Sequence, residues 1–312
     1  MILVTGGAGF VGLNVIEQLR ARGDEVLVYD LERPRLEVRF AHGDVVQPLD
    51  DLLARNRVKR IIHLAAITPD AERETREPGR IAEVNLLGTL NVLQAAQRHG
   101  VERMVYASTG AVYGAAGVGV DHPLDEDADR PVPQSMYGIA KYAAERACLR
   151  LAELWQLDVR VGRLATAFGR WEHATSARTV LSPPTVVARI ARQGGEAVFP
   201  PIGATDYIYA PDLAGAIVAL LDANAPNHRL YHLGTGAAWS LSEWCELLKQ
   251  RFPRFRWRES ARDAECNVLP LTRTTRSRFS NARLTRDLSW RPRFTLEQAL
   301  DDFLDWMGKH ES

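Results

Sequence analysis

The stretch "LVTGGAGFVG", residues 3–12, decides which fold this chain is expected to adopt. Its glycines Gly6, Gly9 and Gly12 directly follow a short apolar run and precede a segment with helical spacing. Between a strand and a helix, glycines at these positions allow a tight turn, close approach of a pyrophosphate to the backbone, and close packing of the helix. The free N–H groups at the start of the helix then face the phosphates. The stretch therefore predicts a loop that binds the phosphates of a dinucleotide.

Apolar runs and helical segments alternate through the first half of the chain. Short apolar runs predict buried strands, and segments with an apolar residue every three or four positions predict helices. The expected strands lie at residues 2–5, 25–30, 60–66, 103–108 and 158–164, and the expected helices at residues 10–22, 81–99 and 136–155. With right-handed crossovers, this alternation predicts a doubly wound parallel sheet covered by helices on both faces, a Rossmann-type α/β fold.

The alternation weakens in the second half, where proline and glycine become frequent. Shorter helices are expected there, at residues 211–221, 240–251 and 295–307. We interpret residues 1–165 as a dinucleotide-binding domain and residues 166–312 as a smaller substrate-binding part. Some segments of that smaller part are expected to return to the sheet.

The charge balance argues against a general affinity for polyanions. Lys plus Arg and Asp plus Glu number 39 each among 312 residues, so no global field attracts nucleic acid or an anionic membrane. The sequence has no apolar run of about 18 residues and begins without a charged leader, so neither a membrane helix nor a signal peptide is expected. The three cysteines form no paired motif and the eight histidines show no ligand spacing, so we expect reduced thiols in the cytoplasm and no metal site.

The second expected strand ends in "VLVYD", whose last residue is Asp30. A carboxylate at this distance from the glycine loop is placed to bind the ribose hydroxyls of the adenosine, and it repels the additional phosphate of NADP. Asp30 therefore favours NAD, although Arg33 and Arg35 follow closely and leave the preference open.

Several further motifs resemble those of the extended short-chain dehydrogenase/reductases, also called the NAD-dependent epimerase/dehydratase family. The resemblance covers nearly the whole chain, and each motif is weak by itself but all occur in the family's order. They are "TGGAGFVG" at residues 5–12, "HGDV" at 42–45, "HLAA" at 63–66, "NLLGTLNVLQAA" at 85–96, "YASTGAVYG" at 106–114, "YGIAK" at 137–141, "TDYIYAPDLA" at 205–214, "YHLGTG" at 231–236 and "LSWRPRFTLEQAL" at 288–300.

The resemblance implies a Rossmann-type domain, a C-terminal substrate domain and reversible hydride transfer at a carbinol carbon. The most similar members of the family act on nucleotide-activated sugars as epimerases, dehydratases or decarboxylases. Many are homodimers that pair two long helices, which correspond here to residues 81–99 and 136–155. The implied partners are therefore a sugar-type small molecule and a second copy of the chain.

The resemblance also assigns residues to the NAD site. In addition to the three glycines, Asp30, Tyr137 and Lys141, it implies contacts from Phe10, Val11, Asp44, Val45, Leu64, Ala65, Ala66, Asn85 and Ser108. Asp44 corresponds to the residue that holds the adenine. Asn85 is expected either to support a water or backbone group near the lysine or to be a structural helix residue.

Tyr137 and Lys141 are four positions apart, so on a helix their side chains project from the same face. Removing hydride from an alcohol also requires removal of its proton, and a phenol with its usual pKa of about 10 is a poor base at neutral pH. A lysine ammonium and the oxidised nicotinamide ring would lower that pKa. The family's catalytic hydroxyl falls on Thr109, which is expected to hold the substrate oxygen, with Ser108 as the alternative.

The substrate half departs from the family's pattern at two positions. Thr166 stands where the family usually has Asn, and Thr205 stands where nucleotide-sugar enzymes usually carry an Arg that clamps the pyrophosphate. A threonine replaces neither the charge nor the forked donors of that arginine. We therefore regard Thr166, Arg178, Arg273 and Arg276 as the candidate substrate-binding residues.

An unusual stretch, "GRWEHATSARTVLSPP" at residues 169–184, lies where the family builds its substrate pocket. Trp171, Glu172, His173 and Arg178 are its polar and aromatic candidates. A Glu-His pair in a loop is most often solvated, so neither Glu172 nor His173 is assigned a catalytic role.

Three functions remain open from the sequence. The first is an NAD-dependent epimerase or a related enzyme acting on a nucleotide sugar. The second is an NAD-dependent dehydrogenase of a smaller sugar, sugar acid or hydroxy compound, which the absence of the arginine at Thr205 favours. The third is a non-catalytic NAD-binding regulator, against which Thr109, Tyr137 and Lys141 argue.

Overall fold

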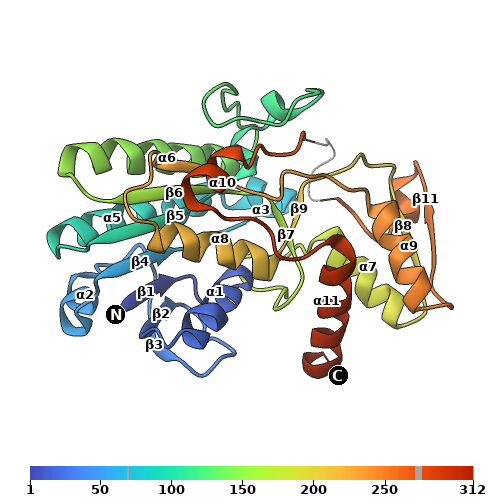
Figure 1. The fold of residues 1–312 in the computed structure, drawn as a ribbon, viewed down its shortest axis with the longest axis horizontal. Coiled ribbons are helices and arrows are strands. Elements are labelled where there is room, and N and C mark those ends of the chain that lie inside the picture. The colour runs from blue at the N-terminus through green and yellow to red at the C-terminus, as the bar shows by residue number, and fades with distance from the viewer. Residues whose placement is uncertain (69, 271–275, 312) are drawn as a thin grey trace.

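A computed structural model describes residues 1–68, 70–270 and 276–311 of the chain (Figure 1). Seven parallel strands form the main sheet in the order β10-β6-β5-β4-β1-β2-β3. They are β1 (Ile2–Thr5), β2 (Val26–Asp30), β3 (Arg39–His42), β4 (Arg60–His63), β5 (Arg103–Thr109), β6 (Val159–Leu164) and β10 (Leu230–Leu233). The predicted doubly wound parallel sheet is therefore confirmed. β3 was not predicted, because its sequence "RFAH" lacks the apolar run of a buried strand.

Helices cover both faces of this sheet (Figure 1). On one face, α1 (Phe10–Ala21) and α8 (Ala210–Asp222) share an apolar core with β1 and β2. On the other, α2 (Asp50–Asn56), α5 (Thr89–Arg98) and α6 (Met136–Trp155) pack on the sheet. The helix predicted at residues 136–155 has the bounds of α6.

The helix predicted at residues 81–99 is divided into three pieces. It consists of α4 (Pro78–Ala82), the π-helical η1 (Glu83–Gly88) and α5. Within η1 the buried Asn85 hydrogen-bonds both backbone polar groups of Ile67, with distances of 3.0 Å from Ile67 N to Oδ1 and 2.9 Å from Nδ2 to Ile67 O. These two hydrogen bonds join the helix to the segment that follows β4.

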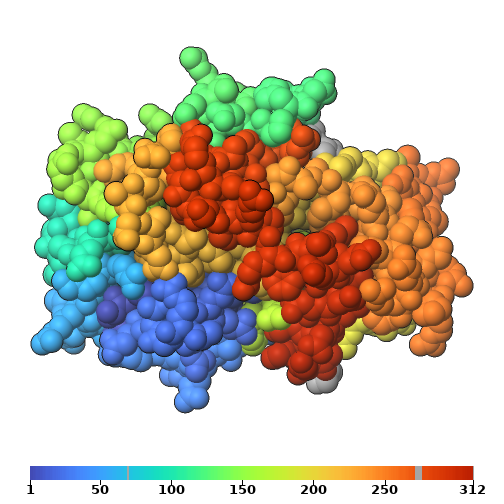
Figure 2. All heavy atoms as spheres, viewed as in Figure 1, coloured from blue at the N-terminus to red at the C-terminus, as the bar shows by residue number. Residues whose placement is uncertain are grey.

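The second half of the chain builds a separate core and also contributes to the main sheet. α7 (Pro183–Arg192), α9 (Leu241–Arg251) and α11 (Leu296–His310) share an apolar cluster with β8 (Glu196–Phe199). Figure 2 shows these segments in yellow, orange and red at the right of the molecule, with orange and red segments reaching across its centre. β10 and α8 return to the sheet.

The remaining elements are short. They are the helices α3 (Ala71–Arg76) and α10 (Ala282–Leu288), the 3-10 turns η2 (Gly110–Val112), η3 (Ala115–Gly117) and η4 (Asp263–Glu265), the pair β7 (Thr166–Phe168) and β9 (Tyr207–Tyr209), and β11 (Arg256–Glu259), which pairs with β8. Among the described residues, no helix is both long and apolar enough to cross a membrane, and no cluster of three or more His, Cys, Asp or Glu side chains is arranged to hold a metal ion.

Candidate active site

The glycine loop between β1 and α1 forms a cradle into which side chains would not fit. Gly6 has a φ of +71°, and a Cβ on it would lie 2.5 Å from the backbone nitrogen of Ala65. A Cβ on Gly12 would lie 2.4 Å from the oxygen of Gly6. Gly9 is the N-cap of α1 and brings no side-chain cap, and the first turn of the helix carries no acidic residue. The first amides of α1, from Phe10 and Val11, are therefore available to an anionic group, as a dinucleotide phosphate requires.

Asp30 lies at the carboxyl end of β2, beside this loop. Its carboxylate accepts hydrogen bonds from the amides of Ala8 at 2.9 Å and Glu32 at 3.2 Å. Burial raises the pKa of Asp30 although these amides act against the shift. A half-buried carboxylate next to an uncapped helix N-terminus fits the ribose of a dinucleotide.

The residues expected around the adenine and nicotinamide differ in their contacts within the protein. Asp44 forms an ion pair with Arg80 and accepts a hydrogen bond from the amide of Val46 at 3.2 Å. Val45 is buried in the core beneath α5, where it contacts Gly88, so its side chain serves packing. The predicted residues after β4, namely Leu64, Ala65 and Ala66, follow the strand directly, with Ala65 against Gly6.

Tyr137 lies in the first turn of α6, close to the carboxyl end of β5. Burial raises the pKa of its phenol, while side-chain hydrogen bonding with Thr109 and Thr68 and the charges of Arg178 and Arg276 act to lower it. The predicted partner Thr109 is thus next to the phenol. Thr68 was missed because no motif marks it. The two arginines are the cations with the largest effect on Tyr137, a role the sequence had given to Lys141.

Lys141 is one helical turn beyond Tyr137 and is almost fully buried. Its Nζ lies over the ring of Tyr106, 4.3 Å from the centroid. Burial lowers the pKa of Lys141 to about 7, and the charges of Cys148 and Glu145 act in the opposite direction. In this environment the ammonium gains from an additional hydrogen-bond acceptor, such as a ribose hydroxyl.

Ser108 does not face the substrate side. Its buried hydroxyl donates to Glu145 Oε2 at 2.7 Å, and Glu145 also forms a buried ion pair with Arg163 at 2.6 Å. Thr109, in contrast, accepts a hydrogen bond from the amide of Ala111 at 3.2 Å, and this bond leaves its hydroxyl proton available for donation. The geometry therefore favours Thr109 over Ser108 as the catalytic hydroxyl, because the Ser108 hydroxyl is engaged with Glu145.

Asn85 is likewise engaged by the protein itself. Its amide is fully used on the backbone of Ile67, as described above, and its side chain is buried. Asn85 therefore joins η1 to the backbone that follows β4, as a structural helix residue does, and its expected role near Lys141 stays a prediction.

Two guanidinium groups approach Tyr137 with unsatisfied donors. Arg178 Nε and Arg276 Nη1 are buried and have no hydrogen-bond partner among the described residues. Arg276 passes Gly110, where a Cβ would lie 2.9 Å from Nη1. Burial lowers the pKa of Arg276, against the charges of Tyr137 and Asp206. Buried donors without acceptors are costly, so both arginines point to an anionic ligand at this place. The third candidate, Arg273, lies outside the described residues.

The unusual stretch at residues 169–184 is built differently from the expectation. Glu172 is not solvated but buried, and its carboxylate accepts hydrogen bonds from Ser182 and Thr185 and pairs with Arg178 at 2.5 Å. Trp171 is buried against Trp306 and does not line the pocket. The expectation of a solvated glutamate was wrong because no local pattern indicates the hydroxyls and the guanidinium that surround it in the fold.

The departures from the family's pattern meet at one place. Thr166 in β7 pairs with Tyr207 in β9, and its amide donates to the oxygen of Asp206 at 3.2 Å. Thr205 is bridged to Trp239 by backbone hydrogen bonds. The buried Asp206 carboxylate accepts from the amides of Thr235 and Phe279, both at 3.1 Å, so it joins segments distant in sequence.

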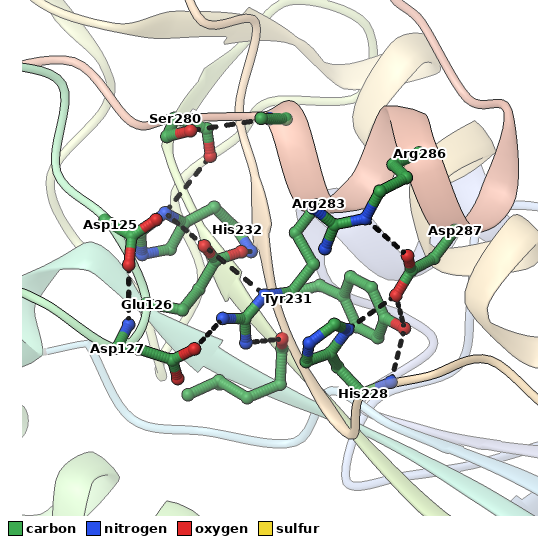
Figure 3. A network of polar contacts seen from close by, with 12 residues as sticks. Asp125, Glu126, Asp127, His228, Tyr231, His232, Ser280, Arg283, Arg286 and Asp287 are labelled. Atoms are coloured by element: carbon green, nitrogen blue, oxygen red, sulfur yellow. Dashed lines mark hydrogen bonds and ion pairs between the residues drawn. The ribbon is translucent and has the colours of Figure 1, made fainter.

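A second polar network surrounds His232, and Figure 3 shows its part around Glu126, Asp127 and Arg283. Arg163 donates to the Tyr113 hydroxyl at 2.6 Å, and that hydroxyl contacts His232 Nε2 at 2.6 Å. The amide of His232 donates to Glu126 at 2.8 Å, and Arg283 pairs with Asp127. Burial lowers the pKa of His232 to about 3, so this histidine is neutral. The network joins the loop at residues 125–127 to β10 and α10.

Comparison with known proteins agrees with this geometry. The model of the NAD dependent epimerase/dehydratase family matches residues 2–234. A UDP-glucose 4-epimerase of Corynebacterium glutamicum is 30% identical over 268 residues, which cover 80% of this chain and 79% of that protein.

Two solved structures are similar over the full length. The UDP-glucose 4-epimerase of Thermotoga maritima with UDP-glucose is 25% identical and superimposes with a TM-score of 0.83, covering 100% of this chain and 99% of that one. MoeE5 in complex with UDP-glucose and NAD is 25% identical with a TM-score of 0.79, over 100% and 99% of the two chains. The chain therefore belongs to the NAD dependent epimerase/dehydratase family and is an NAD-dependent enzyme.

Proposed function

We propose that this enzyme epimerises, or otherwise modifies without net oxidation, a carbinol carbon in the sugar of a nucleotide sugar. The observation that carries the proposal is that Arg178 and Arg276 both act on Tyr137, while Arg178 Nε and Arg276 Nη1 are buried and have no hydrogen-bond partner among the described residues. A neutral small sugar would bring no anionic acceptor to these two nitrogen donors, whereas a sugar nucleotide brings a diphosphate. The similar proteins named UDP-glucose 4-epimerase support the same class.

The catalytic roles follow from where the polar groups lie. Tyr137, as the phenolate, takes the proton of the substrate hydroxyl, and Thr109 donates a hydrogen bond to the same oxygen as charge develops on it. Arg178 and Arg276 favour the phenolate because both are cations beside it. Lys141 binds the nicotinamide ribose. The glycine loop, the amides of α1 and Asp30 would hold NAD, which supplies a hydride acceptor.

Arg276 is the leading candidate to bind the diphosphate. It lies over Gly110 and Gly117, both between β5 and the segment that precedes α6, and its Nη1, which has no partner among the described residues, can donate to an anion. It comes from a different part of the chain than Thr205, where the family usually has its arginine. Arg276 would therefore supply, from another part of the chain, the positive charge that Thr205 lacks.

The second candidate is an NAD-dependent dehydrogenase of a smaller anionic sugar, such as a sugar acid. Thr205 favours it, because the usual diphosphate clamp is absent from that position. A carboxylate would satisfy one of the two guanidinium groups, and a diphosphate could satisfy both.

Calorimetry with UDP, GDP, CDP and dTDP in the presence of NAD distinguishes these candidates. We expect one of the four to bind, and Arg276→Met to weaken it. If none binds at millimolar concentration, the nucleotide-sugar proposal is wrong and the small-sugar dehydrogenase takes its place. Parallel assays should follow NADH absorbance and product identity, because an epimerase accumulates no NADH and a dehydrogenase does.

We also propose that the enzyme is a cytoplasmic homodimer. Leu87 in η1 and Ile139 and Leu154 in α6 are exposed apolar residues on the two helical segments that dimers of this family pair. The three cysteines are free, as a reducing compartment would allow. Sedimentation analysis should give twice the mass of one chain, and Leu154→Asp should shift it toward one chain.

A further inference from the structure

A surface cavity of about 510 Å³ lies at the edge of the main sheet that is formed by β10. Its walls come from residues 126–131 before α6, from α6 itself, from residues 228–230 at the start of β10, and from α10. Arg146 lines it and lies about 14 Å beyond Tyr137 along the axis of α6. The cavity is therefore separate from the active site, and its volume is typical of a site for a small molecule.

One side of the cavity carries more arginines than the protein itself neutralises. Arg150 pairs with Glu153 at 3.2 Å. Arg130 and Arg146 line the cavity without a hydrogen bond or ion pair to any described residue. Arg229 donates to backbone oxygens, the nearer at 3.0 Å. Guanidinium groups from three segments that face one cavity repel one another, and an anion bound between them offsets this repulsion.

The other side of the cavity is acidic, and Figure 3 shows its residues Glu126 and Asp127. Glu126 is buried, and its Oε1 accepts a hydrogen bond from the amide of His232 at 2.8 Å. Its Oε2 has no hydrogen-bond partner among the described residues, because the nitrogens of His232 and Arg283 remain 3.7 and 3.8 Å away. Asp127 pairs with Arg283, and Asp129 completes this side. Ionised carboxylates accept hydrogen bonds from hydroxyl groups and repel other anions.

The two sides together restrict the chemistry of a ligand. Arginines from three segments suit a phosphate, which carries more oxygens and more charge than a carboxylate does. The acidic side repels a second anionic group at the other end of the ligand, so a nucleic acid or a chain of phosphates does not fit. It accepts hydrogen bonds from hydroxyl groups instead, as a sugar provides.

We propose that this cavity binds a sugar that carries one phosphate. The phosphate lies on the side of Arg130, Arg146 and Arg229, and the sugar hydroxyls donate to Glu126 and Asp127. A monosaccharide phosphate and a nucleoside monophosphate share this chemistry. The inference goes beyond the proposed function and does not depend on it.

Calorimetry on the NAD-loaded protein tests the site, with ribose 5-phosphate, glucose 1-phosphate and UMP as probes. Inorganic phosphate and glucose serve as the two parts of such a ligand. We expect at least one probe to bind at millimolar concentration or below, and each part to bind at least about tenfold more weakly.

The double variant Arg130→Met/Arg146→Met should weaken this binding by about tenfold to a hundredfold, because charge-assisted contacts are lost. Both arginines are exposed and unpaired among the described residues, so urea denaturation should give the parent's free energy of unfolding. Arg20→Met is the matched control, because Arg20 is an exposed arginine of α1, which lies on the opposite face of the sheet from α6. It should bind the probes as the parent does.

Asp127→Asn tests the acidic side separately. The amide keeps the shape of the side chain but removes its charge, so the probe should bind about tenfold more weakly. Inorganic phosphate should bind at least as well as to the parent, since a nearby anion has been removed. Equal weakening of the probe and of inorganic phosphate would contradict the assignment of the hydroxyls to this side.

The dependence on Arg146 also identifies the source of the ligand. If UMP binding requires Arg146, the site accepts a nucleotide, and if only the monosaccharide phosphates bind, it takes a sugar phosphate. Both results support the site.

The site is refuted if no probe binds at millimolar concentration, if the double variant binds the probes as the parent does, or if inorganic phosphate binds as tightly as they do. It is also refuted if Arg276→Met weakens the binding and the double variant does not, because the probe then occupies the active site. If the double variant changes the sedimenting mass of the protein, the two arginines serve a contact between copies of the chain instead.

Discussion

Arg163 and Arg276 are two arginines at the same end of the sheet with opposite surroundings. Burial disfavours the charge of Arg163, but Glu145 at 2.6 Å outweighs this effect and raises its pKa, and the Tyr113 hydroxyl accepts a further bond. Burial lowers the pKa of Arg276, and its Nη1 has no partner among the described residues. One guanidinium is satisfied by the protein, and the other lacks an acceptor.

The same contrast separates other neighbours. Ser108 and Thr109 are consecutive, yet the first is used on Glu145 and the second is next to Tyr137. Folded proteins pair nearly all buried polar groups, so the exceptions need an explanation. The satisfied groups hold the strand ends in place, whereas the unsatisfied Arg178 Nε and Arg276 Nη1 belong to the two arginines that act on Tyr137, where we propose that a ligand binds.

The largest effect is expected from Tyr137→Phe. We expect turnover to fall by about a hundredfold to ten-thousandfold, because general acid–base catalysis is lost. NAD binding, measured by calorimetry, should be retained. Tyr142→Phe on the same helix is the control and should keep its turnover. Near-parental turnover of Tyr137→Phe would contradict the catalytic assignment.

The Arg163→Met variant should be less stable to unfolding than the parent protein. Removal of this partner leaves the buried Glu145 carboxylate uncompensated, so the free energy of unfolding should decrease by about 3–5 kcal/mol. Urea denaturation measures it, with Arg150→Met as the control because Arg150 is exposed and pairs with the exposed Glu153 at 3.2 Å. A loss of less than about 1 kcal/mol would show that the satisfied network does not stabilise the fold as argued.

Arg276→Met should leave stability unchanged and damage substrate binding. KM should rise by about tenfold to a hundredfold, since a contact worth about 1.5–3 kcal/mol is lost. The pH–rate profile should also shift to higher pH, because removal of a cation beside Tyr137 raises the pKa of the phenol and leaves less phenolate at neutral pH. Arg278→Met, two positions along, is the control. If the Arg276→Met protein were destabilised and had a normal KM, Arg276 would stabilise the fold, as Arg163 does, and would not bind the substrate.

Asp30→Ala tests a residue that is intermediate between Arg163 and Arg276. The Asp30 carboxylate is half-buried and accepts hydrogen bonds from two backbone amides. NAD should bind about tenfold more weakly, as expected for loss of a charge-assisted hydrogen bond, and the difference between NAD and NADP should narrow. Glu25→Ala, at the opposite end of β2, should bind both as the parent does. Tighter binding of NADP than of NAD by the parent would contradict the role of Asp30.

The sequence by itself determined the features that depend on short stretches of chain. The glycine spacing, the alternation of strands and helices, and the four-residue separation of Tyr137 and Lys141 are local, and local conformation follows from sterics and periodicity. The bounds of α6 could therefore be predicted, as could the parallel sheet and the end of β2 at Asp30.

Only the tertiary structure decided which polar groups meet. The partners Ser108–Glu145, Glu172–Arg178 and Tyr137–Arg276 include neighbours that loops bring together from separate parts of the chain. Their encounter depends on loop paths and packing, which no local pattern encodes. For this reason Thr68 was missed, Glu172 was expected in solvent, and Ser108 was expected as a cofactor contact and as the alternative to Thr109. Burial then sets the free energies, because a polar group inside the protein must be paired either by the chain or by its ligand.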